Sequence, residues 1–218
     1  MPRRYKLLIF DWDGTLMDSA AAIAASIQSA CRDLGLRVPT EGEARYIIGL
    51  GLDDAMKHLL PELEPAFYPR LVDRYRQHFL QRDAGTGLFP GTVDAVRKLH
   101  AGGHLLAIAT GKSRRGLDRA LRTTGLTRYF HRTRCADEGY SKPHPGMLQC
   151  LLDELNVPAS SALMIGDTTH DMDMARAAGV DGLAVTYGAH GREALVCSSP
   201  IACVDRDHEL WQWLEEHA

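Results

Sequence analysis

The chain has 218 residues, of which 45% are hydrophobic and 24% are charged, and 25 basic against 28 acidic side chains give a net charge of −3. These values are typical of an ordinary globular protein and exclude disorder, collagen-like repeats and coiled coil. The charges of both signs are interspersed, so the sequence lacks the basic surface of a nucleic-acid-binding protein. At about 150 residues per domain, the length corresponds to one domain with a large insertion or to two small ones.

Cysteine and apolar patterns indicate a reducing compartment. The five cysteines form an odd set without a Cys-x-x-Cys pair, which is typical of small buried thiols. Basic residues near the N-terminus precede an apolar run of only Leu7–Phe10, which is shorter than the roughly 7–15 residues of a signal core. No stretch reaches the roughly 18 apolar residues of a membrane span. We expect a cytoplasmic protein that binds neither membrane nor nucleic acid.

Short apolar runs predict buried strands. The first is Tyr5–Phe10, and similar runs recur at Leu105–Ala109, Ala162–Ile165 and Gly182–Val185. Continuous apolar runs of this length are typical of strands that are covered on both faces. Helical patterns lie between them and begin near Thr92, Ser113, Pro145 and Thr169. This alternation predicts an α/β fold with a parallel sheet.

The segment 17–86 interrupts the alternation. Its apolar residues follow helical spacing: one helix begins at Ser19, a capping box at Thr40–Glu43 opens another, and a third covers Tyr68–Phe79. The pattern predicts helices and no strand here. We therefore expect an α/β core made of residues 1–16 and 87–218, with an all-helical insertion over 17–86.

Polar side chains follow the predicted strands where they end. Asp11 and Asp13 come directly after the first strand and point the same way, since residues two apart in an extended segment share a direction. Other polar residues follow the later strands or precede a helix: Thr110 with Gly111, Lys142, Asp167, and Asp171 one helical turn later. The carboxyl ends of parallel strands meet at one edge of the sheet, where open α/β folds bind ligands.

The polar side chains at the ends of the predicted strands indicate a site for phosphate chemistry. Clustered carboxylates repel one another unless a hard cation is present, and oxygen ligands suit Mg²⁺. A lysine, a hydroxyl group and a cation around a carboxylate nucleophile form a site for a tetrahedral dianion.

Four segments together resemble the motifs of the haloacid dehalogenase-like (HAD) hydrolases. They are Asp11-Trp-Asp-Gly-Thr-Leu, Ala109-Thr110-Gly111, Ser141-Lys142-Pro143 and Gly166-Asp167-Thr-Thr-His-Asp171, in the family's order. The helical insertion stands where this family carries its C1 cap, and the chain looks like the phosphoglycolate phosphatase-like branch. The resemblance implies a Rossmann-like parallel sheet with helices on both faces and an inserted all-helical cap.

The resemblance also implies catalytic roles. Asp11 would attack phosphorus and become an aspartyl phosphate, while Asp13 would protonate the leaving alcohol and then act as base towards water. Thr110 would bind a phosphoryl oxygen, with Gly111 beside it. Lys142 would balance the charge between the nucleophile and the phosphoryl group.

A metal site is implied by the same motifs. Asp11, the backbone carbonyl of Asp13 and Asp167 would hold Mg²⁺, and Asp171 would act at the metal or by bonding the lysine. His170, beside Asp171, is expected to be peripheral rather than a ligand. The expected activity is Mg²⁺-dependent hydrolysis of a small phosphate ester.

Other activities share some of these residues. A dehalogenase shares Asp11 but needs no acid such as Asp13. A sugar phosphomutase of the β-phosphoglucomutase type keeps all four motifs and stays open as the alternative. A phospho-accepting switch also combines a nucleophilic Asp with Mg²⁺, Thr and Lys, but the second carboxylate and the inserted cap favour turnover.

The inserted cap is expected to contact the leaving group. The loop Ile47–Gly51 resembles the one that faces the active site in phosphoglycolate phosphatase-like proteins, and Gly49 and Gly51 would let backbone amides approach a small ligand. 2-Phosphoglycolate is the predicted substrate, with sugar phosphates, a nucleotide and pyrophosphate as alternatives. A monomer and a homodimer are both compatible with the sequence. Basic residues that could meet a substrate carboxylate are Arg45 and Lys57, with Lys112, Arg114 and Arg115 as further candidates.

Overall fold

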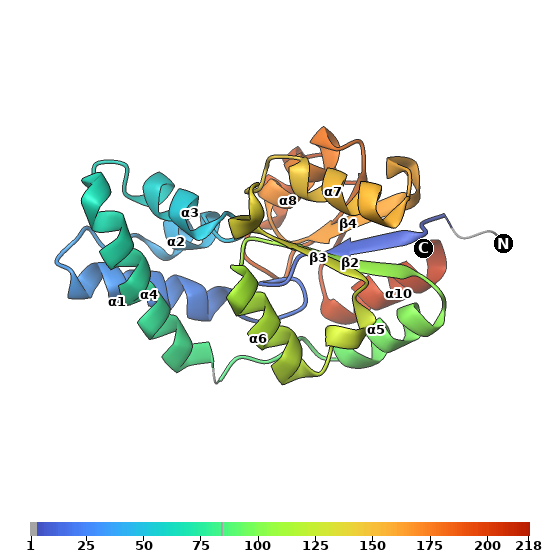
Figure 1. Ribbon diagram of the computed structural model, residues 1–218, viewed down its shortest axis with the longest axis horizontal. Coiled ribbons are helices and arrows are strands. Elements are labelled where there is room, and N and C mark those ends of the chain that lie inside the picture. The colour runs from blue at the N-terminus through green and yellow to red at the C-terminus, as the bar shows by residue number, and fades with distance from the viewer. Residues whose placement is uncertain (1–3, 84) are drawn as a thin grey trace.

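The computed structural model describes residues 4–83 and 85–218, and a parallel sheet forms its centre (Figure 1). Six strands of the described chain lie in the order β3-β2-β1-β4-β5-β6, so the first strand in sequence sits inside the sheet. Each neighbouring pair is parallel, which requires a crossover between the strands of a pair. The strands are β1 Leu7–Phe10, β2 Leu105–Thr110, β3 Arg132–Cys135, β4 Ala162–Gly166, β5 Asp181–Val185 and β6 Ala202–Val204.

Alternate residues of β1 face two different hydrophobic clusters. Leu8 and Phe10 pack with α5, α6 and α10, whereas Leu7 and Ile9 pack with α7 and α8. These two groups of helices cover opposite faces of the sheet (Figure 1), which explains why the strand is apolar throughout. The helices of this part are α5 Thr92–Ala101, α6 Arg114–Thr124, α7 Gly146–Leu155, α8 Thr169–Ala177, α9 Arg192–Cys197 and α10 Asp207–His217.

Helices α1 to α4 form a separate group, here called the helical block, beyond one end of the sheet (Figure 1). They share their own hydrophobic cluster, in which Ile27, Met56 and Leu71 are almost fully buried. The predicted capping box is present at the start of α2, because Thr40 Oγ1 accepts a hydrogen bond from the Glu43 amide at 3.2 Å. The bounds are α1 Ala20–Asp33, α2 Glu41–Tyr46, α3 Leu52–Leu59 and α4 Tyr68–Asp83, and short 3-10 helices lie at η1 Pro65–Phe67, η2 Thr127–Tyr129, η3 Ala136–Glu138 and η4 Ala159–Ser161.

The predicted strands are confirmed, but several peripheral elements were not predicted. The edge strand β3 reads Arg-Thr-Arg-Cys and exposes Arg132, so it lacks the apolar run that marks a strand covered on both faces. The opposite edge strand, β6, has only three residues. Helices α3, α9 and α10 were likewise missed as individual elements. Helix α7 begins at Gly146, with Pro145 as its N-cap rather than its first residue.

All five cysteines are free thiols. Cys31 and Cys135 are buried as predicted, whereas Cys197 is exposed. The expectation of burial is wrong there because Cys197 ends the short surface helix α9. Among the described residues, none of the helices combines the length and the apolar character that a membrane crossing requires.

Replacement of Ile108 by alanine should lower the free energy of unfolding by about 2–5 kcal/mol, because its side chain fills the cluster between the sheet and α5, α6 and α10. Ile201→Ala is the matched control, since Ile201 is 40% exposed; its cost should stay below about 1 kcal/mol. Urea unfolding followed by circular dichroism measures both. Equal losses would show that this cluster does not carry the stability assigned to it.

Candidate functional site

The structure brings the sequence-predicted polar residues together at one edge of the sheet. Asp11, Thr110 and Asp167 follow or end β1, β2 and β4, while Lys142 precedes α7 and Asp171 lies in the first turn of α8. All five side chains are buried. Parallel strands that end at the same level explain how residues so far apart in sequence meet.

Lys142 lies between two carboxylates. Its Nζ is 2.8 Å from Asp11 Oδ1 and 2.6 Å from Asp171 Oδ1. Burial disfavours the lysine's charge, but the two carboxylates outweigh it and raise the pKa of Lys142 above its usual value. Of the roles expected for Asp171, bonding to the lysine is the one that the structure displays.

Asp11 is the least hydrogen-bonded of the buried carboxylates. Neither of its oxygens accepts a hydrogen bond from another described residue, apart from the ion pair with Lys142. Burial raises the pKa of Asp11 to about 7, against the opposing charge of Lys142. A buried carboxylate with open oxygens is suited to bind a cation or to attack an electrophile.

Three carboxylates could hold a metal ion. Asp11, Asp167 and Asp171 each offer an oxygen, and these oxygens lie within 4.8 Å of one another. Burial and the charges of the other two carboxylates raise the pKa of Asp167 well above its usual value. A hard divalent cation would offset this crowded negative charge, and an all-oxygen donor set fits Mg²⁺. The donor chemistry and the open oxygens of Asp11 therefore fit the expected ion.

The position of Asp167 is set by close backbone packing and hydrogen bonds. Its Oδ1 accepts a hydrogen bond from Thr15 Oγ1 at 2.8 Å, and its Oδ2 accepts one from the Ala189 amide at 2.7 Å. A Cβ atom on Gly14 or Gly188 would lie 2.1 or 2.2 Å from Asp167 Oδ2. Only glycine allows the backbone to approach this carboxylate so closely.

Asp171 also closes the first turn of α8. Its Oδ2 accepts hydrogen bonds from Thr168 Oγ1 at 2.6 Å and from the Thr168 amide at 3.1 Å. The same residue thereby orients the lysine with one oxygen and caps a helix with the other. The start of α8 is thus linked through Asp171 to the ion pair with Lys142.

Asp13 has two partners that the sequence analysis did not assign to it. Ser19 Oγ, just before α1, donates a hydrogen bond to Asp13 Oδ1 at 2.7 Å. Lys112 Nζ lies 2.8 Å from both carboxylate oxygens, and 4.8 Å from the centre of the Phe79 ring on α4. Lys112 was predicted only as a candidate for substrate binding; its position two residues after Thr110, at the end of β2, is the signal that places it here.

The glycines singled out in the sequence lie where the loop 47–51 meets the strand ends. A Cβ on Gly111 would come within 2.5 Å of the carbonyl oxygens of Gly49 and Leu50. The backbone carbonyls of the loop therefore pack directly against Gly111. The Gly51 amide donates a hydrogen bond to Ser141 Oγ at 2.8 Å.

Two histidines contact the backbone just before this loop. His170 Nε2 and His190 Nε2 lie 2.8 and 2.9 Å from the carbonyl oxygen of Tyr46. His190 Nδ1 accepts a hydrogen bond from the Thr169 amide at 3.0 Å, so its proton is on Nε2. Burial lowers the pKa of both histidines. His170 contacts the Tyr46 carbonyl, while His190 and Tyr46 were missed because their pairing depends on the folded chain.

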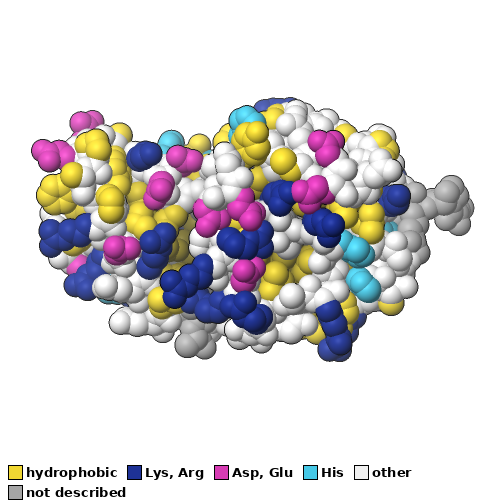
Figure 2. All heavy atoms as spheres, in the orientation of Figure 1, with side chains coloured by type: hydrophobic (Ala, Val, Ile, Leu, Met, Phe, Trp, Pro, Cys, Tyr) yellow, Lys and Arg dark blue, Asp and Glu magenta, His cyan; other side chains and the backbone are white. Residues whose placement is uncertain are grey.

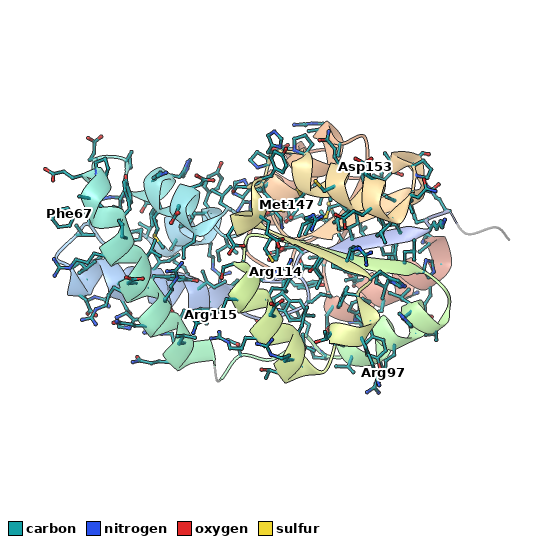
Figure 3. The ribbon with its side chains drawn as sticks, in the orientation of Figure 1. Phe67, Arg97, Arg114, Arg115, Met147 and Asp153 are labelled. Atoms are coloured by element: carbon teal, nitrogen blue, oxygen red, sulfur yellow. The ribbon has the colours of Figure 1, made fainter. Side chains whose placement is uncertain are left out.

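A cavity of about 900 Å³ lies between the strand ends and the helical block. Figure 2 shows lysine and arginine side chains gathered where the two parts meet, and Figure 3 shows Arg115 between α6 and α4. Asp11 and Asp13 line the cavity from the sheet side, and Ile27 lines it from α1. Its basic lining residues are Lys57, Arg76, Lys112, Arg115, Arg119 and Arg122.

Two of the expected substrate-binding arginines have other partners. Arg45 pairs with Glu41 at 2.9 Å and is absent from the cavity lining. Arg114 pairs with Glu138 at 2.9 Å and with Asp118 at 3.2 Å. Lys57, Lys112 and Arg115 do line the cavity.

Comparison with known proteins agrees with this geometry. The family model of the haloacid dehalogenase-like hydrolases matches residues 8–185. A Dickeya dadantii protein named "Probable phosphatase IndB" is 34% identical, with 94% of this chain and 91% of the relative covered. A phosphoglycolate phosphatase of Aliivibrio fischeri is 32% identical, with 92% of each chain covered. A hydrolase structure from Pseudomonas syringae shares the fold, with a TM-score of 0.89, 22% identity, and coverage of 98% of this chain and 99% of the other. The chain therefore belongs to the haloacid dehalogenase-like hydrolase family.

Proposed function

We propose that the protein is a Mg²⁺-dependent phosphomonoesterase that acts through an aspartyl phosphate, with 2-phosphoglycolate as its substrate. The observation that carries the proposal is the buried Asp11 carboxylate, which lines the cavity with no hydrogen bond to its oxygens while Lys142 holds it from one side. The names of the relatives support a phosphatase, and that of the Aliivibrio fischeri protein supports the substrate.

Four residues of the chain have distinct roles in the two steps of the reaction. An oxygen of Asp11 attacks phosphorus, and the leaving alcohol takes a proton from Asp13. Water then attacks the aspartyl phosphate and gives a proton to Asp13, so phosphate leaves and Asp11 is restored. Thr110 binds a phosphoryl oxygen, and Lys142 offsets the charge that builds up on the phosphoryl group.

Mg²⁺ would complete the charge balance. Asp11, Asp167 and the backbone carbonyl of Asp13 would hold the ion, with Asp171 close by, and the ion would supply positive charge for the transferring phosphoryl group. The three buried carboxylates carry more negative charge than the Lys142 ammonium group offsets, which supports this assignment.

The helical block is proposed to act as the cap of the family. Its separate hydrophobic cluster and its contribution to the cavity wall support a body that closes over the substrate. The two parts meet near Met17, whose backbone pairs with that of Asp13 on one side and Leu88 on the other. A closed cap excludes water and orients the leaving group.

A sugar phosphomutase is the alternative that uses the same residues. The product distinguishes them, because hydrolysis releases inorganic phosphate whereas a mutase returns an isomeric sugar phosphate. Release of phosphate from a panel of phosphate esters, with kcat/KM for each, is the direct test of activity and substrate.

Asp11→Asn should reduce turnover by more than about 1,000-fold, because an amide cannot attack phosphorus. The fold should persist, since Lys142 keeps Asp171 as a partner at 2.6 Å. Steady-state kinetics measures the loss, and circular dichroism checks folding. Substantial activity in the variant, together with failure to trap phosphate-labelled wild-type protein, would contradict covalent catalysis by Asp11.

Removal of the metal should abolish activity, and Mg²⁺ should restore it. Ca²⁺ should restore it poorly, because it prefers more ligands at longer distances and would displace the nucleophile relative to phosphorus. Phosphate release in chelator-treated protein, before and after each ion is added, measures this. Full activity in excess chelator would remove the metal from the proposal.

Ser141→Ala should lower kcat/KM for 2-phosphoglycolate about fivefold, with a smaller loss for p-nitrophenyl phosphate. The change removes the hydroxyl that accepts a hydrogen bond from Gly51 at 2.8 Å and so loosens the loop 47–51 without adding bulk. It is preferable to Gly49→Val, because Gly49 has φ +96° and its added Cβ would lie 3.1 Å from Thr168 Oγ1, next to Asp171.

The exposed Ser160 offers a matched control, and Ser160→Ala should change neither rate. Equal losses on both substrates in folded Ser141→Ala protein would mean that the loop does not select the leaving group.

A further inference from the structure

Lys112 makes a contact that competes with the role proposed for Asp13. Its ammonium group lies 2.8 Å from both oxygens of Asp13, and Ser19 donates a third hydrogen bond to the same carboxylate. Both partners of the ion pair are largely buried, with side chains 11% and 10% exposed. Such a pair is held strongly, because removal of one partner leaves the other charge poorly solvated.

This contact and that of Ser19 occupy most of the positions at which Asp13 would carry its proton. As the acid of the first step, Asp13 must hold a proton on one oxygen and direct it at the leaving oxygen. In the structure, Lys112 donates to both oxygens and Ser19 donates to Oδ1, so about three of the four acceptor positions of the carboxylate are taken and one, on Oδ2, is left. The leaving oxygen can approach Asp13 more freely once Lys112 moves away from one of these oxygens.

An anionic group on the leaving alcohol is placed to draw Lys112 away. During proton transfer, the ester oxygen must lie within about 3 Å of Asp13, hence close to the lysine that now contacts the same carboxylate. In 2-phosphoglycolate the carboxylate oxygens extend roughly 3–4 Å beyond the ester oxygen, which is within reach of a flexible lysine side chain.

The surroundings of Lys112 favour such a ligand. Lys112 lines the cavity, its Nζ lies 4.8 Å from the centre of the Phe79 ring, and Lys57 and Arg115 line the same cavity. The aromatic face stabilises the ammonium group within the cavity, and the additional cations attract an anion rather than a neutral group.

We propose that Lys112 determines specificity by exchanging partners: it leaves Asp13 for an anionic group adjacent to the ester oxygen of the substrate, and Asp13, released from the lysine, takes a proton from the solvent and passes it to the ester oxygen as the alcohol leaves. The proposal rests on the proposed phosphatase function. Lys112 then both recognises the substrate carboxylate and releases Asp13, the acid. Phosphate esters with neutral leaving groups leave Lys112 on Asp13 and react slowly.

The test compares 2-phosphoglycolate with ethyl phosphate, which has a methyl group in place of the carboxylate. Lys112→Met should lower kcat/KM for 2-phosphoglycolate about 30-fold and raise kcat for ethyl phosphate about two- to fivefold, because Asp13 is then unblocked. Lys112→Arg, which keeps the charge, should recover part of the preference for the carboxylate. A purely structural role would lower both rates together and would not produce opposite changes.

Arg122→Met is the matched control, since Arg122 lines the same cavity and makes no ion pair or hydrogen bond with Asp13 among the described residues. It should leave the ratio of the two kcat/KM values within about threefold of that of the wild type. An equal collapse of the ratio in Arg122→Met and Lys112→Met would overturn partner exchange in favour of the overall charge of the cavity.

Binding provides a readout that does not depend on turnover. Calorimetric titration of Asp11→Asn and Asp11→Asn/Lys112→Met protein, both with Mg²⁺, should show 2-phosphoglycolate bound about 30-fold more weakly by the double variant. Inorganic phosphate should weaken by less than about threefold, because it lacks the carboxylate. Equal affinities of the two proteins for 2-phosphoglycolate would overturn the proposal.

The two proposals can fail separately. If the wild type releases phosphate from none of the esters, the proposed function fails, and the titration still decides whether Lys112 binds the carboxylate. If the wild type hydrolyses the esters and Lys112→Met keeps the wild-type ratio, the proposed function stands and the role of Lys112 is wrong.

Discussion

The buried charge of Lys142 is the constraint on which the rest of the site depends. An ammonium group removed from water costs several kcal/mol unless opposite charges balance it, and here Asp11 and Asp171 do so at 2.8 and 2.6 Å. The three residues come from the end of β1, the loop before α7 and the first turn of α8. Their contact therefore requires that the sheet, two loops and a helix start be correctly assembled, and it ties the folding of the core to the formation of the site.

The negative charge of the carboxylates at this site exceeds the positive charge of Lys142. One lysine meets two carboxylates directly, while Asp167 lies beside them with its own pKa raised by burial and by their charges. Stability alone would favour fewer buried charges. Excess negative charge in a dry region raises the affinity of a site for a divalent cation, which would offset the charge of an incoming phosphoryl group.

Much of this site could be predicted from the sequence because its signals are local. Asp11 and Asp13 follow an apolar strand, and Asp171 follows Asp167 by one helical turn, so neighbouring residues reveal both the element and the direction of the side chain. The central strands were predictable for the same reason. The edge strand β3 was not, because Arg132 gives it the character of a surface loop.

Some contacts between distant segments were beyond sequence reasoning. Lys112 pairs with Asp13 across 99 positions of the chain, and Tyr46 meets His170 across 124. A lysine two residues past a strand is compatible with many partners, and a backbone carbonyl has no sequence signature at all. The pairing of β1 with β2 brings Lys112 to Asp13, and the packing of the helical block against the strand ends brings Tyr46 to His170.

The attachment of the loop 47–51 has a mechanical consequence. The carbonyl of Tyr46 before the loop is held by His170 and His190, and the Gly51 amide at its end is held by Ser141. The segment is thus fastened at both ends to the sheet side, although it connects two helices of the block. Any rotation of the block would pivot about this fastened segment, so the far ends of α1 and α4 would travel farthest. The width of the cavity near Arg76 and Leu80 would then change as the block rotates, while the space beside Gly111 would keep its shape.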